Sequence, residues 1–257
     1  MTATGMHGSL HHHPPLTPAG VLLQSRWAAL LVTFSFVILA VLAAIDDAAI
    51  LQGIDEPVTR ALLDLRSGPL DEVVKTLSAL GGVTVVVAVA GLLLLLVWHE
   101  CRPLAWTLLA ATAARPLLEW TLKELVDRPR PNIDRLVAGN GPSFPSGHVM
   151  AAIAIWGLLP PVVALLTGRR SAWWWSVAIS ATVIVSVAFS RVYLGVHWLS
   201  DVVGALLLGA LYLLAVEALL EWHHRRRPCR AIDVAEGAAP PHHGFFRASQ
   251  PGERDPT

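Results

Sequence analysis

The sequence is poor in charged residues. Only 15% of its 257 residues are Asp, Glu, Lys or Arg, whereas soluble globular domains carry roughly 25%, and 54% of the residues are hydrophobic. The 19 basic and 19 acidic residues cancel. A soluble domain or a disordered chain would carry more charge, and a nucleic-acid binder would show a basic excess. The composition therefore indicates an integral membrane protein.

Cysteine and lysine are also scarce. The two cysteines, Cys101 and Cys229, lie far apart and have no metal-ligand spacing, so we expect neither a disulfide framework nor a metal site from them. Lys75 and Lys123 are the only lysines among the 19 basic residues. Lys123, in the middle of a chain that otherwise uses arginine, therefore requires an explanation.

The sequence contains several long runs of apolar residues. A bilayer core of about 30 Å needs roughly 20 apolar residues in a helix. Six segments approach this length: Trp27–Ile45, Leu77–Trp98, Pro103–Leu125, His148–Leu166, Trp173–Tyr193 and Asp201–Glu221. We therefore expect an all-α fold, an integral membrane bundle of six transmembrane helices over residues 27–221. Residues 1–26 and 222–257 are then two cytoplasmic tails, the first disordered and the second basic and then disordered.

Two regions of this layout carry polar residues. Arg115 and Glu119 are four residues apart in the third apolar segment, so they share a helix face, which Lys123 continues. We interpret the Arg115–Glu119 pair as a buried structural ion pair under the site rather than a substrate contact. The acidic stretch 46–75 is predicted to be a surface loop with a short amphipathic helix around Val58–Leu65.

The arginines give the chain an orientation. Six spans place both termini on one side of the membrane. Arg102, Arg169, Arg170 and the cluster 225–227 lie close to helix ends on that side, whereas the 46–75 loop on the other side is acidic. By the positive-inside rule we expect cytoplasmic termini.

Seven polar residues then lie together at the opposite, extracytoplasmic face: Lys123, Arg130, Ser146, His148, Arg191, His197 and Asp201. Arginine and lysine can clamp a phosphate, and Ser146 and Gly147 lie just before a helix, where free N–H groups favour an anion. Two histidines allow one nucleophile and one general acid. Asp201 lies four residues after His197 and can accept its imidazole N–H. The pattern favours phosphoryl transfer through a phosphohistidine, with no metal and no cofactor.

These residues fall into three blocks with a specific spacing. The blocks are Lys123-x6-Arg130-Pro131, Pro145-Ser146-Gly147-His148 and Ser190-Arg191-x5-His197-x3-Asp201. They resemble the three-part signature of the type 2 phosphatidic acid phosphatase superfamily, which includes undecaprenyl-diphosphate phosphatases, phosphatidylglycerophosphate phosphatases and the soluble vanadium haloperoxidases. The signature covers residues 123–201, and every signature position matches.

The resemblance implies a role for each matching residue. Lys123, Arg130 and Arg191 would bind the phosphate oxygens, with Ser146 and Gly147 completing the pocket. His148 would protonate the leaving oxygen. His197 would attack phosphorus and Asp201 would orient it. Water would then hydrolyse the phosphohistidine.

The expected function is that of a multi-pass cell-membrane lipid phosphatase. Candidate substrates are a polyprenyl diphosphate, phosphatidic acid or phosphatidylglycerophosphate, and family analogy with the outward site favours undecaprenyl diphosphate. A transporter, a non-enzymatic lipid-binding protein and a haloperoxidase are the alternatives. Arg128 and Arg135 fit either the steering of anionic head groups or a solvated loop. We expect a lipid phosphate and the bilayer as partners and no nucleic acid.

Overall fold

The computed structural model describes residues 26–45, 49–227 and 229, and every regular element within these residues is a helix. The predicted tails lie outside this part of the chain, except that residues 222–226 continue the last helix. In chain order the helices are α2 (Arg26–Ala44), α3 (Ala49–Leu63), α4 (Gly68–Ala79), α5 (Val83–Val97), α6 (Arg102–Val126), α7 (Gly147–Trp156), α8 (Leu159–Thr167), α9 (Arg170–Tyr193) and α10 (Leu199–Arg226).

The number of transmembrane helices is not confirmed as six. Three helical segments are long and apolar enough to cross a bilayer: Gly147–Thr167, Arg170–Tyr193 and Leu199–His224. Helices α4 and α5 count as a fourth only if they are one span bent by 42°. The apolar part of α2, Ala28–Ala44, is shorter than the others. Helix α6 has 25 residues, but Arg115, Glu119, Lys123 and Glu124 lower its hydropathy.

The second apolar segment is broken where two glycines meet. Helix α4 ends at Ala79 and α5 begins at Val83. The prediction of one continuous helix over Leu77–Trp98 is therefore wrong. A Cβ at Gly81 would lie 2.6 Å from the carbonyl oxygen of His148 and 2.7 Å from a methyl of Val187. Gly81 therefore lets this turn pass directly against α7 and α9.

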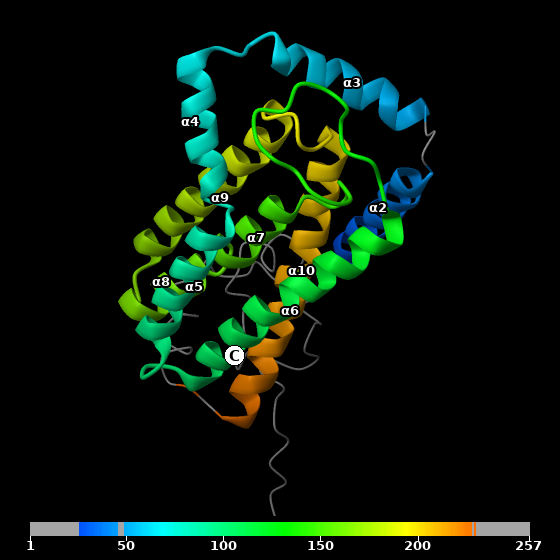
Figure 1. The fold of residues 1–257 in the computed structure, drawn as a ribbon. Coiled ribbons are helices and arrows are strands. Elements are labelled where there is room, and N and C mark those ends of the chain that lie inside the picture. The colour runs from blue at the N-terminus through cyan, green and yellow to red at the C-terminus, as the bar shows by residue number, and fades with distance from the viewer. Residues whose placement is uncertain (1–25, 46–48, 228, 230–257) are drawn as a thin grey trace, which may run out of the picture.

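The prediction for residues 46–75 is wrong in part. This region contains two helices, α3 and most of α4, rather than a loop with one short helix. Figure 1 shows α3 lying across the end of the bundle, beside the long connection 127–146, the C-terminal end of α9 and the N-terminal end of α10. Asp55 and Thr59 of α3 are buried, so one face of this helix belongs to the packed interior.

Helix α10 packs against α2, α6 and α7, and α7 in turn packs against α9. Small residues make the closest of these contacts possible. A Cβ at Gly204 would collide with the ring of Phe144, and one at Gly209 would collide with Ile153. Close approach of backbones at small residues is the usual packing mode of helices in lipid.

The other end of the bundle holds a disulfide. Cys101, at the start of α6, is bonded to Cys229, just beyond α10, and their Cα atoms are 5.7 Å apart. The expectation that these cysteines do not pair is therefore wrong. Their separation of 128 residues is bridged because α6 begins and α10 ends at the same end of the fold.

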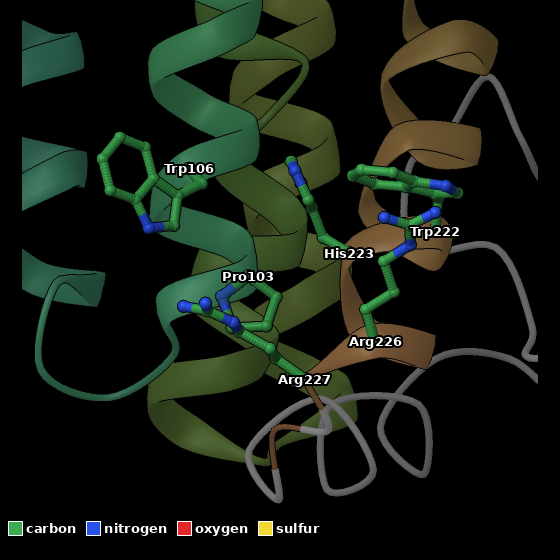
Figure 2. A pocket seen from close by; sticks show the side chains of 6 residues that line it. All are labelled: Pro103, Trp106, Trp222, His223, Arg226 and Arg227. Carbon is green, nitrogen blue, oxygen red and sulfur yellow. The ribbon is translucent and has the colours of Figure 1, made fainter.

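A hollow of about 430 Å³ lies near this disulfide, between the start of α6 and the end of α10. Figure 2 shows Pro103 and Trp106 on one side and Trp222, His223, Arg226 and Arg227 on the other. The Arg226 guanidinium lies 4.0 Å from the centre of the Trp222 ring. None of the three signature blocks contributes to this hollow, so it is not the predicted phosphate site.

Candidate active site

The signature residues all come from helix ends or connections at the end of the bundle covered by α3. Lys123 lies in the last turn of α6, Arg130 in the 127–146 connection, and Arg191 in the last turn of α9. Ser146 is the N-cap of α7, and Asp201 lies in the first turn of α10. The backbone N–H of Ser146 donates to the carbonyl oxygen of Asp201 at 3.3 Å, which joins the second block to the third.

His197 is held between an arginine and a carboxylate. Arg130 Nη1 lies 3.1 Å from His197 Nε2, and His197 Nδ1 lies 3.4 Å from Asp201 Oδ2. A guanidinium only donates hydrogen bonds, so Nε2 is the acceptor and the ring proton is on Nδ1, facing Asp201. At 3.4 Å the Nδ1 atom faces the carboxylate without making a hydrogen bond to it. The lone pair of Nε2 points toward the basic residues and is engaged by Arg130, so Arg130 must release it before Nε2 can bond to another atom.

The surroundings of His197 keep its ring neutral. Its side chain is almost fully buried, and this burial, together with the positive charges of Arg130 and Arg191, lowers the pKa of His197 to about 4, although Asp201 opposes the shift. A neutral imidazole at pH 7 is the form that can act as a nucleophile.

The basic side chains are anchored by hydrogen bonds to backbone and hydroxyl groups. Arg130 donates to the carbonyl oxygens of residues 140–142 and, at 2.6 Å, to that of Val196. Lys123 Nζ donates to the carbonyl of Pro142 at 2.8 Å, and Arg191 Nη1 donates to Ser78 Oγ at 2.6 Å. The charges of Arg130 and Arg191 both act on Lys123, so the three cations form one cluster.

Three buried polar atoms at this cluster have no hydrogen-bond partner among the described residues. They are Ser146 Oγ, Arg191 Nε and His197 Nδ1. Buried polar groups in folded proteins are normally paired, so such atoms call for a ligand. The N-terminus of α7 adds free N–H groups and a favourable dipole at Ser146. The arrangement fits an anion with several oxygens, such as a phosphoryl group.

Comparison with known proteins identifies the family. The model of the PAP2 superfamily matches residues 104–226. Phosphatidylglycerophosphatase B of Bacillus subtilis (strain 168) is 30% identical over 206 residues, which cover 72% of this chain and 93% of that protein. The chain belongs to the PAP2 superfamily. With its apolar helices, it is a membrane phosphatase of PAP2 type, which agrees with the resemblance and with the expected hydrolase activity.

The fold is similar to a solved PAP2 structure. The crystal structure of the first transmembrane PAP2 type phosphatidylglycerolphosphate phosphatase from Bacillus subtilis matches with a TM-score of 0.65 and 29% identity, over 76% of this chain and 96% of that one. An undecaprenyl-diphosphatase of Sulfolobus acidocaldarius is 46% identical over only 68 residues, 26% of this chain and 29% of that protein.

The Arg115–Glu119 pair borders the PAP2 signature residues. Arg115 Nη1 lies 2.5 Å from Glu119 Oε2, so the predicted ion pair is present. The Glu119 carboxylate also packs against Gly147, where a Cβ would collide with it. The pair therefore supports the first turn of α7 from the side of α6.

Sequence reasoning missed the role of Arg128. We expected a head-group contact or a solvated charge, but Arg128 is buried and forms ion pairs with Asp55 of α3 and Asp201 of α10. Ser200 Oγ accepts a hydrogen bond from the same arginine. Arg135, the other loop arginine, donates two hydrogen bonds to the carbonyl oxygen of Pro131. The position of Arg128 inside the first signature block was the one available signal, since Asp55 lies in a stretch read as a surface loop.

Proposed function

We propose that this PAP2 protein is a lipid phosphatase that removes a terminal phosphoryl group through a phosphohistidine at His197, at the extracytoplasmic face. The observation that carries the proposal is the orientation of His197. Its Nε2 accepts a hydrogen bond from Arg130 at 3.1 Å while its Nδ1 faces Asp201. The nucleophilic lone pair therefore points toward the cationic cluster, and it becomes free for attack when Arg130 Nη1 turns from Nε2 to an oxygen of the bound phosphoryl group.

The proposed reaction has two displacements at phosphorus. In the first, His197 Nε2 forms a bond to phosphorus while the bond from phosphorus to the lipid oxygen breaks, and His148 donates a proton to that oxygen. Asp201 stabilises the imidazolium that forms. In the second, water attacks the phosphohistidine and gives a proton to His148, so that inorganic phosphate and neutral His197 are released. Lys123, Arg130, Arg191, Ser146 and Gly147 bind the phosphoryl oxygens in both transition states.

Among the candidate substrates, we place phosphatidylglycerophosphate first. The relative named phosphatidylglycerophosphatase B aligns over 93% of its length, whereas a putative undecaprenyl-diphosphatase of Escherichia coli (strain K12), also 30% identical, aligns over 71% of its own. This order reverses the expectation from sequence, which favoured undecaprenyl diphosphate. Phosphatidic acid remains a third candidate because the phosphoryl pocket alone does not distinguish lipid tails.

The nucleophile is tested by trapping the phosphoenzyme. We expect the full-length protein in detergent, mixed with a ³²P-labelled lipid phosphate and quenched, to carry an acid-labile and base-stable phosphoryl group. His197→Ala should carry none and should lose at least about a thousandfold in kcat, since the nucleophile is removed. His99→Ala, an exposed histidine near the other end of the bundle, is the matched control. An undiminished phosphoenzyme in His197→Ala would show that another residue attacks.

The role of His148 is tested with two leaving groups. A lipid alkoxide needs a proton to leave, whereas p-nitrophenolate does not. We expect His148→Ala to lose far more activity on lipid phosphates than on p-nitrophenyl phosphate. Equal losses on both substrates would contradict a role in protonating the leaving oxygen. Binding of lipid phosphates without any release of inorganic phosphate by the wild-type protein would contradict the proposal as a whole.

A further inference from the structure

A buried ion network lies behind the candidate nucleophile and joins three elements distant in sequence. Its members are Asp55 in α3, Arg128 in the 127–146 connection, and Ser200 and Asp201 at the start of α10. Resting on the proposed function, we propose that Arg128 and Asp55 are positioning residues, which orient the Asp201 carboxylate and set the charge that acts on His197.

The hydrogen bonds of Arg128 fix the direction of Asp201. Nη1 donates to Asp201 Oδ1 at 2.7 Å and to Ser200 Oγ at 2.6 Å, while Nη2 donates to Asp55 Oδ2 at 2.8 Å. With Oδ1 taken by Arg128, the second oxygen of Asp201 faces the backbone N–H of Trp198 and the ring of His197. Rotation of the carboxylate away from His197 would break the bond to Arg128.

Asp55 fastens the other side of the network to α10. Its Oδ1 accepts the backbone N–H of Ser200 at 2.9 Å, and its Oδ2 accepts the Ser200 hydroxyl at 2.5 Å. Ser200 lies in the first turn of α10, whose N–H groups have no partner within the helix. A carboxylate at this position is favoured by the helix dipole. Asp55 therefore acts as a cap supplied by α3, and it holds the turn that carries Asp201.

The charged residues of the network are buried, so a change in their net charge acts strongly on neighbouring groups. Asp55 and Asp201 are 1% and 0% exposed, and Arg128 is 7% exposed. Within this buried network one guanidinium pairs with two carboxylates, and the charges of Arg130 and Lys123 act on Asp201 as well. Removing one member of such a set leaves a buried charge without its partner, which has large effects on neighbouring groups.

Several charged groups face His197 from the elements packed around it. They are Asp201 on α10, Arg130 in the connection, Arg191 on α9 and His148 on α7. None of these side chains is itself substituted when Arg128 or Asp55 is changed. A shift in the titration of His197 in such variants therefore reports the charge of the network together with the position of the Asp201 carboxylate that it holds.

The two network residues carry opposite charges, so their variants should shift the pH profile in opposite directions. Arg128→Gln leaves two carboxylates uncompensated, which favours the imidazolium and raises the pKa of His197. The acid limb of kcat/KM should move to higher pH by about one unit. Asp55→Asn removes one negative charge from the network and leaves Arg128 paired with Asp201 alone, which lowers the pKa of His197. The acid limb should therefore move to lower pH. In both variants kcat should fall roughly tenfold or more with little change in KM, because Asp201 is less well held.

The experiment measures kcat/KM against pH for the full-length protein in detergent on one lipid phosphate, whose own titration is common to all variants. The double variant Asp55→Asn/Arg128→Gln removes one charge of each sign, so its acid limb should return near that of the wild type while kcat stays low. Arg135→Gln and Asp64→Asn change exposed residues beside the same elements and should match the wild type. Thermal unfolding in detergent reports the folded fraction of each variant.

A purely structural role predicts a different result. Activity would then fall only in proportion to folded protein, with an unchanged pH profile, and that result would overturn the proposal. If Arg128→Gln does not fold, Arg128→Lys keeps the charge but cannot bridge both carboxylates with a planar fork. Its acid limb should match the wild type with a lower kcat, and an undiminished kcat would overturn the proposal. Failure of the proposed function would instead appear in the wild type, as a missing phosphoenzyme.

Discussion

At the scale of single residues, the site depends on which atoms remain available to a substrate. Arg130 Nη1 donates to His197 Nε2, which assigns the ring proton to Nδ1. Ser146 Oγ and Arg191 Nε are buried without a partner in the described structure. The phosphoryl-transfer proposal requires these two features: a defined tautomer of the nucleophile His197, and unpaired hydrogen-bond donors beside it for the phosphoryl oxygens.

The neutrality of His197 gives a prediction for the dependence of stability on pH. Its pKa is about 4 in the folded protein and near 6.5 when unfolded. The unfolded state therefore binds more protons between these values. The free energy of unfolding should be fully maintained above pH 6.5 and should fall as the pH drops toward 4, by up to about 3 kcal/mol.

Thermal unfolding in detergent between pH 4 and 8 measures this contribution. His197→Gln is the matched variant, because it keeps a polar side chain that does not titrate. The slope of stability against pH between 4 and 6.5 should be smaller in the variant than in the wild type. An identical slope in both proteins would mean that other groups account for the loss in acid.

At the scale of elements, the contact between α7 and α10 depends on small side chains. Helix α7 carries His148, the proposed general acid, and α10 carries Asp201, which faces the proposed nucleophile His197. Gly209 of α10 packs against Ile153 of α7, which allows the two helices to approach closely, and Gly204 of α10 packs against Phe144 in the connection before α7. The separation of the catalytic groups is therefore set partly by residues that have no chemistry of their own.

Gly209→Ala should separate these helices. The added methyl group would collide with Ile153, and overpacking of this kind costs about 1–3 kcal/mol. We expect a lower midpoint of thermal unfolding and reduced kcat. Gly91→Ala on α5 is the matched control, because a Cβ there meets nothing within 4 Å. It should leave the midpoint unchanged or raise it slightly. Equal midpoints for the two variants would contradict the packing argument.

At the scale of the whole molecule, the two ends of the bundle differ in kind. One end carries the PAP2 signature residues under α3, and the other carries the disulfide and the hollow shown in Figure 2. The arginine distribution predicts that the disulfide end faces the cytoplasm, a compartment in which disulfides are rare. The orientation of the protein in the membrane therefore determines whether the Cys101–Cys229 bond lies in a reducing or an oxidising compartment.

Labelling of intact cells tests the orientation. In a background of Cys101→Ser and Cys229→Ser, a cysteine is placed at exposed Ala138 in the 127–146 connection, or at exposed His99 near the other end. We expect a membrane-impermeant maleimide to label Ala138→Cys in intact cells and His99→Cys only after lysis. The reverse pattern would place the signature residues in the cytoplasm. Activity of the cysteine-free protein in detergent checks that the site survives.

The sequence by itself determined the membrane class, the long apolar helices and the identity of the signature residues. Composition and spacing suffice for these, because a bilayer sets the length of a helix and phosphoryl chemistry restricts the residue types. Only the tertiary structure decided three other features: the break between α4 and α5, the helix α3, and the Cys101–Cys229 bond. Each depends on a contact between residues far apart in the chain. The same holds for Asp55 and Arg128, because their ion pairs form only when folding brings them together beside Asp201.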